Sequence, residues 1–147
     1  MPQVRHIGLL LMSALLLGCS PSHDSVEVAG VIRLHDGIAE VRAPGQPNAR
    51  ITPDGDLSLT GKSVIMTPDQ HSLIQQYYIE AYKLGSQGPS HSDAAMMCDS
   101  LDRLRTTQND LARQVAAFRP YAEINDDSVL ECRANPQGRG GGDASHS

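Results

Sequence analysis

With 147 residues and a formal net charge of −5, the chain is long enough for one domain with a hydrophobic core but not comfortably for two. Its twelve Lys and Arg residues are scattered, whereas nucleic-acid-binding proteins cluster such residues on one face, so that class is not expected. Four Tyr, one Phe and no Trp also disfavour a carbohydrate-binding cleft, because such clefts rely on stacking aromatic rings.

The first 18 residues are built like a secretory signal. Arg5 supplies a positive charge, residues 7–17 supply a short apolar stretch and the small residue Gly18 follows, which is the order of a cleaved export signal. The apolar stretch is too short for a permanent membrane-spanning helix. The motif LLGC at 16–19 resembles the lipobox of bacterial lipoproteins. This resemblance implies cleavage before Cys19 and attachment of diacylglycerol and palmitate to it; the alternative is a soluble exported protein whose cysteine is incidental.

The lipoprotein resemblance also implies a location. Several acyl chains on one residue suffice for stable anchoring, since each buried CH₂ contributes about 0.8 kcal/mol. Ser20 stands where an aspartate usually retains lipoproteins at the inner membrane, so the resemblance implies an outer-membrane lipoprotein that faces the periplasm. The chain then divides into a signal peptide (1–18), a polar tether (19–25), a single domain (26–133) and a Gly-rich tail (134–147) predicted to be disordered.

Residues 26–65 have the composition of short β-strands joined by tight turns. A DG pair at 36–37 lies between two apolar runs and predicts a two-residue hairpin turn, because such a turn needs positive φ angles. A DG pair at 54–55 and a GK pair at 61–62 predict two further turns. We therefore expect an antiparallel meander of about four or five strands.

The spacing of apolar residues changes at Thr67 from the period of a strand to that of a helix, which predicts the start of a helix there. Thr67 is a capping residue, Pro68 fits the first helical position, and Gln70 completes a capping box. Gly85 predicts the end of this helix. Its apolar residues form one stripe that we expect to pack on the sheet: Leu73, Ile74, Tyr77, Ala81 and Leu84.

A long helix is predicted over residues 93–118 and is expected to end before Pro120. Its inward-facing residues recur at steps of three and four: Ala94, Met97, Leu101, Leu104, Gln108, Leu111, Val115 and Phe118. This spacing is typical of a helix that packs along one seam.

Residues 121–132 predict a turn followed by a short helix. We expect Asp126 or Asp127 to cap it, and Val129 and Leu130 to face inward. The expected fold is α+β, with a small antiparallel β-meander followed by two main helices and a short C-terminal helix.

Once Cys19 is assigned to lipid, Cys98 and Cys132 remain as an even pair in an oxidising compartment. We expect them to form a disulfide, and closing a loop of about 35 residues would stabilise the fold by roughly 3 to 4 kcal/mol. The alternative is two free thiols or a metal site. No CxxC spacing is present and no histidine lies within a helical turn of either cysteine, so zinc is not supported.

Candidate catalytic or metal-binding groups are sparse. His35 lies beside a predicted turn, and His71 and Asp69 are two residues apart, which places them on different helix faces. His91 stands in a predicted loop. The chain has no GxSxG motif, and GRGGG at 138–142 lacks the preceding strand and following helix of a phosphate-binding loop. We expect no enzymatic activity, no cofactor and no metal.

Asp99 and Asp102 are three residues apart on the long helix and could form a paired-carboxylate site. Arg103 and Arg105 follow directly. We therefore expect a solvated face of salt bridges instead.

Three tyrosines on the first helix offer a candidate surface. Tyr77 can face the core, while Tyr78 and Tyr82 are four residues apart and share another face. Partly exposed tyrosines favour protein interfaces, so Tyr78 and Tyr82 are the candidate partner-binding residues. The alternative is that all three pack against the sheet or the long helix.

The segment RITPDGDLSLTGKSVIMTPDQHSLIQQYYIEAY at 50–82 resembles the YggN-like family of periplasmic proteins of unknown function. Met66 and His71 depart from the family's usual Leu and Arg. The resemblance implies a fold element and a compartment but no activity. The matching residues are Gly55, Leu57, Gly61, Lys62, Thr67, Pro68, Gln70, Tyr77 and Tyr78.

A narrower resemblance is carried by HDGIAEVRAPGQPNARITPDG at 35–55 and by FRPYAEI at 118–124. These segments are similar to small lipoproteins of the Xanthomonas and Stenotrophomonas group that serve as immunity proteins against antibacterial effectors of a type IV secretion system. The resemblance implies a secreted toxic effector as the binding partner, with no nucleic acid involved. The alternative is a non-enzymatic structural or assembly lipoprotein of the envelope.

Overall fold

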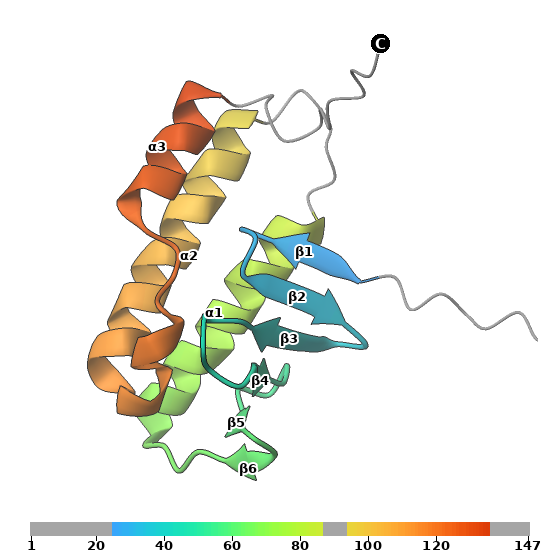
Figure 1. The fold of residues 1–147 in the computed structure, drawn as a ribbon, viewed down its shortest axis with the longest axis vertical. Coiled ribbons are helices and arrows are strands. Elements are labelled where there is room, and N and C mark those ends of the chain that lie inside the picture. Colours follow the sequence, from blue (N-terminus) through green and yellow to red (C-terminus); the bar gives the residue numbers. More distant parts are fainter. Residues whose placement is uncertain (1–24, 87–93, 136–147) are drawn as a thin grey trace, which may run out of the picture.

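The computed structural model describes residues 25–86 and 94–135, which form one antiparallel sheet followed by helices (Figure 1). The six strands pair in chain order: β1 Val26–Val28, β2 Ile32–His35, β3 Ile38–Val41, β4 Ala49–Ile51, β5 Leu57–Leu59 and β6 Lys62–Ser63. The helices are α1 Pro68–Ser86, α2 Ala94–Gln114, the 3₁₀ helix η1 Ala116–Tyr121 and α3 Asp126–Ala134. The predicted α+β fold is confirmed, with more strands than expected.

Tight turns with positive φ angles set the strand register. Asp36 and Gly37, at φ +48° and +73°, connect β2 to β3, as the DG pair predicts. The turn before β6 consists of Thr60 and Gly61, at φ +51° and +75°, so its prediction at residues 61–62 was wrong by one position. Lys62 is already paired with β5, because Thr60 supplies the first of the two left-handed residues that the turn needs.

An additional turn raises the number of strands. Ala29 and Gly30, at φ +52° and +71°, divide the first predicted run into β1 and β2, which pair from Val26 opposite Leu34 to Val28 opposite Ile32. β1 thereby becomes one edge of the sheet and β6 becomes the other.

The β4–β5 turn packs directly on α1. Gly55 has φ +90°, and a Cβ atom at this position would lie 2.9 Å from the backbone oxygen of His71. Glycine is therefore required here both for its backbone conformation and for the close approach of the turn to the helix.

Helix α1 begins as predicted. The Thr67 backbone N–H donates to the Gln70 side chain at 3.0 Å and the Gln70 N–H donates to the Thr67 hydroxyl at 3.3 Å, which is a capping box. Gly85 was expected to end the helix, but it lies inside the last turn. A Cβ atom there would lie 2.5 Å from Leu34 Cδ1, so this glycine lets the helix approach β2 closely.

Helix α2 ends earlier than the predicted boundary at Phe118. The backbone becomes extended at Val115, and η1 follows with Pro120 inside it. η1 still carries Phe118 and Tyr121 into the core, where the rings of Phe118 and Tyr77 meet edge to face at 5.3 Å. The apolar spacing therefore continued past the true end of the α-helix.

Helix α3 is capped by Asn125, whose side chain accepts a hydrogen bond from the Ser128 N–H at 3.0 Å. The prediction of Asp126 or Asp127 as the cap was wrong, because both lie in the first turn. In the first turn their carboxylates interact favourably with the positive end of the helix dipole. Val129 is buried as expected.

Leu130 was also predicted to face inward, and this was wrong, because its side chain is 61% exposed. Val129 alone supplies the inward-facing side of α3 at this point of the helix.

The elements form layers, with α1 between the sheet on one side and α2 on the other, and with α3 beside α2 (Figure 1). The inner side of the sheet and the buried stripe of α1 share one core, in which Ile32, Val41, Ile51, Ile74 and Tyr77 are inaccessible to solvent. Within the described part of the chain, no helix is both long and apolar enough to span a bilayer.

Candidate interaction surface

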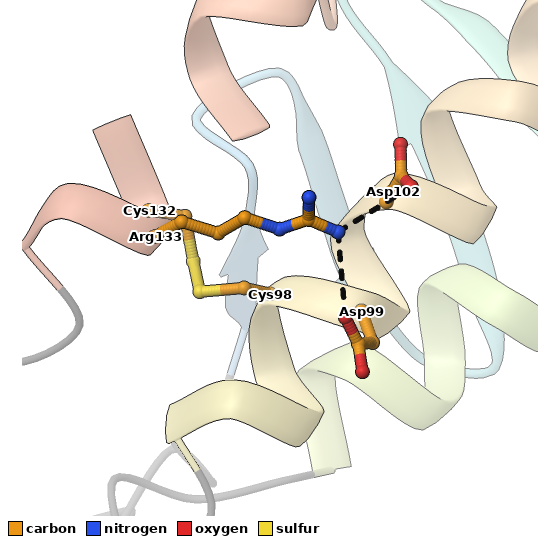
Figure 2. Close-up of a disulfide and its surroundings, with 5 residues drawn as sticks. All are labelled: Cys98, Asp99, Asp102, Cys132 and Arg133. Atoms are coloured by element: carbon orange, nitrogen blue, oxygen red, sulfur yellow. Dashed lines mark hydrogen bonds and ion pairs between the residues drawn. A yellow bond between two sulfur atoms is a disulfide. The ribbon is translucent and has the colours of Figure 1, made fainter. Parts of the chain in front are cut away.

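A disulfide joins α2 to α3 (Figure 2). Cys98 near the start of α2 and Cys132 near the end of α3 are bonded, with an S–S distance of 2.06 Å. The predicted pairing is confirmed, and the alternatives of free thiols or a metal site at these residues are excluded. Arg105, on α2, pairs with Asp126 at the start of α3, so the two helices are linked at both ends of their contact.

The acidic residues beside the disulfide form salt bridges with arginines. Arg133 Nη2 lies 3.4 Å from Asp99 and 3.7 Å from Asp102 (Figure 2), and Arg105 lies 2.8 Å from Asp102. The predicted salt-bridged face is therefore confirmed, although Arg103 turns to α1 and lies 3.7 Å from Glu80. Both carboxylates of the candidate acidic pair are therefore engaged by arginine side chains.

The histidines are separated. His35 lies 3.4 Å from Glu40 on the outer side of the sheet, and His71 lies 3.5 Å from Asp56 and not beside Asp69. His91 lies outside the described residues. Among residues 25–86 and 94–135, no group of three or more His, Cys, Asp or Glu side chains is placed to hold a metal ion.

The outer side of the sheet carries alternating charges. The register places Glu27, Arg33, Glu40 and Arg50 opposite one another in successive strands, with ion-pair distances of 2.9 Å between Arg33 and Glu27 and 3.7 Å between Arg50 and Glu40. Exposed pairs of this kind contribute little free energy. They leave this side of the sheet without a patch of one sign.

Of the two tyrosines predicted to bind a partner, only Tyr82 is accessible. Tyr78 is 7% exposed, because the β2–β3 turn covers it and its hydroxyl donates to the Gly37 carbonyl at 2.9 Å. Burial, together with the neighbouring Tyr82, raises the pKa of Tyr78 above its ordinary value. Tyr82 stacks on Tyr78 with ring centroids 5.5 Å apart and is 45% exposed.

A second exposed apolar side chain was not predicted from the sequence. Ile65, between β6 and α1, is 99% exposed. It lies beside the sheet edge formed by β6, which pairs only with β5 among the described strands. Val64 is partly buried and its N–H donates to the Leu57 carbonyl, so burial alternates along the chain after the β5–β6 turn. The sequence carries no signal of this alternation, because residues 64–66 are all apolar.

The open edge of β6 offers backbone hydrogen-bonding groups. Lys62 faces Leu59 across a two-residue turn, and the backbone groups of such a flanking pair point toward each other. Along an antiparallel ladder, residues whose backbone groups point toward the partner strand alternate with residues whose groups point away. The N–H and C=O groups of Ser63, the next residue, therefore point away from β5. We call Ser63 and Ile65 the β6 edge.

Comparison of the chain with known protein families, with curated proteins and with solved structures finds no significant match. Cys19 and residues 138–142 lie outside the described residues.

Proposed function

We propose that the protein is an outer-membrane lipoprotein, anchored at Cys19 and facing the periplasm, that binds and neutralises a cognate antibacterial effector of a type IV secretion system. In this proposal the protein is an inhibitor and not an enzyme. Its domain need only bind the effector in the compartment where the effector acts.

The Cys98–Cys132 disulfide supports the compartment. Disulfides persist in oxidising environments such as the bacterial periplasm and are rare in the cytosol. The LLGC motif at residues 16–19 supports lipid attachment after export.

The β6 edge is the observation that carries the binding proposal. An exposed strand edge is a template for pairing with another chain, and partners that add a strand gain backbone hydrogen bonds and specificity from nearby side chains. Ile65 projects its whole side chain into solvent next to these backbone groups. We therefore place the effector at the β6 edge.

The test is an affinity pull-down from a lysate of the parent organism. The bait is the mature chain with Cys19→Ser and an intact disulfide, compared with the same chain carrying Ile65→Asp. Met96→Asp is the matched control, because Met96 is also an exposed apolar residue but lies on α2. We expect the wild-type and Met96→Asp baits to retain one secreted effector and Ile65→Asp to lose it. A binding loss of about 2 kcal/mol is typical of a central interface residue and corresponds to about 30-fold in Kd.

The retained protein must also be toxic for the proposal to stand. It is expected to stop growth when exported alone to the periplasm of cells that lack this lipoprotein. Retention of abundant envelope proteins only, equally by all three baits, would favour the alternative of a structural or assembly lipoprotein. An adjacent gene that encodes a large protein with a secretion signal would favour the immunity function.

A further inference from the structure

An apolar face lies where the described chain begins. Val26, on the edge strand β1, and Tyr82, on α1, are both partly exposed. Val26 and Tyr82 line one shallow hollow of about 230 Å³, together with Leu34 and Gly85. We call Val26 and Tyr82 the tether face. It lies at the sheet edge opposite to the β6 edge.

The ring of Tyr82 is held in place by contacts within the domain. Its ring stacks on Tyr78 at an interplanar angle of 28°, and the Tyr78 hydroxyl is fixed by the Gly37 carbonyl. A tyrosine ring with an apolar body and a polar tip is favoured at the level of lipid headgroups. The tether face therefore presents an ordered aromatic ring of the kind found at membrane interfaces.

Among the residues that line the hollow, Asp36 lies 3.5 Å from His35. Lys83, next to Tyr82 on α1, lies 3.6 Å from Glu80. Because the charges of Lys83 and Glu80 offset each other, this pair adds no net negative charge that an anionic lipid surface would repel.

The tether is short. Six residues, 20–25, separate Cys19 from Val26, and this distance is at most about 25 Å when the chain is fully extended. A lipid anchor at Cys19 would therefore hold the membrane at a high effective concentration next to the tether face, so that a contact too weak for free solution becomes populated. Five strand spacings of about 4.8 Å each separate β1 from β6 along the sheet.

We infer that the tether face rests in the headgroup region of the membrane that carries the anchor, so that the β6 edge points into the periplasm. This inference depends on the lipid anchor of the proposed function. It assigns Tyr82 to lipid contact instead of to a protein partner.

Tryptophan fluorescence tests this arrangement, because the chain contains no Trp and each variant then carries a single tryptophan, which is excited selectively over the tyrosines. Tyr82→Trp and Val26→Trp report on the tether face, and Ile65→Trp is the control at the opposite edge. The full lipidated protein is reconstituted into vesicles of phosphatidylethanolamine and phosphatidylglycerol, with and without brominated phospholipid. We expect Tyr82→Trp and Val26→Trp to emit at shorter wavelength and to lose most of their fluorescence to brominated lipid, while Ile65→Trp emits as in water.

The outcomes separate the inference from the proposed function. If the lipidated protein floats with the vesicles but Tyr82→Trp and Val26→Trp emit like Ile65→Trp, the membrane contact is wrong and the anchor stands. If mass spectrometry finds Cys19 unmodified, both the anchor and the contact are wrong. If the purified effector, and not lipid, changes the emission of Tyr82→Trp, this face belongs to the protein interface and the inference is overturned.

Discussion

Replacing Cys98 and Cys132 together by Ala removes the covalent link between α2 and α3 and tests how much of the stability depends on it. The two residues are 34 positions apart, so the bond closes a loop of about 35 residues. The chain-entropy model gives about 12.7 cal/mol/K for such a loop, or about 3.8 kcal/mol at 25 °C. A typical domain is stable by about 5 to 15 kcal/mol, so this loss is a large fraction of the total.

The ion pairs beside the disulfide contribute little when the bond is removed. The ion pairs of Arg133 with Asp99 and Asp102 are solvent-exposed, and exposed pairs contribute about 0 to 1 kcal/mol each. Urea unfolding, followed by far-UV circular dichroism, compares the oxidised wild type with the double variant. The midpoint should fall and the m-value should rise, because the unfolded chain without a cross-link exposes more surface.

Wild-type protein treated with a reducing agent is the matched control and should unfold like the double variant. A loss below about 1 kcal/mol in both would contradict the entropic argument. It would mean that α2 and α3 remain together in the unfolded chain without the bond.

Three further predictions concern buried polar contacts and turn glycines, each measured as a free energy of unfolding in urea. Gln108→Ala removes two hydrogen bonds to the backbone before α3 and should lower the free energy of unfolding by about 3 kcal/mol. The control Asn109→Ala, at an exposed position, should change it by less than about 0.5 kcal/mol, and equal effects of the two variants would refute the role of the Gln108 amide. Tyr77→Phe should stabilise the protein by about 1 kcal/mol or more, since the buried hydroxyl has no hydrogen-bond partner among the described residues, and a destabilised variant would show that the hydroxyl is satisfied. Gly37→Ala should lower the free energy of unfolding by about 1 to 2 kcal/mol because of its positive φ alone. Gly55→Ala should lower it further, because the added Cβ would also meet the backbone of α1, and equal losses for the two variants would contradict that packing.

Local signals in the sequence predicted much of the fold. The DG pair at 36–37 specified its turn, because two residues with positive φ are required there. The Thr67–Gln70 capping box specified the start of α1 for an equally local reason. The cysteine count predicted the disulfide, because only two cysteines remained after the lipobox.

Features that depend on tertiary contacts were not predicted. Asn125 precedes two aspartates that could also cap a helix. The sequence also does not show that the buried Gln108 amide hydrogen-bonds both backbone groups of the adjacent Ile124. The helical spacing placed Tyr78 beside Tyr82, but nothing local indicates that the β2–β3 turn would cover Tyr78.

The β6 edge escaped sequence analysis for a similar reason. Ile65 belongs to an apolar run, VIM, at 64–66, and such a run gives no indication of which member points outward. Only the register set by the Thr60-Gly61 turn makes Val64 face β5 and leaves Ile65 exposed.

Growth protection against the effector tests the central claim most directly. Cells that lack this lipoprotein export the effector to the periplasm and produce wild type, Ile65→Asp or Met96→Asp at equal levels. Wild type and Met96→Asp are predicted to restore growth and Ile65→Asp is predicted to fail. Continued growth arrest in the presence of excess wild-type lipoprotein would contradict the immunity function.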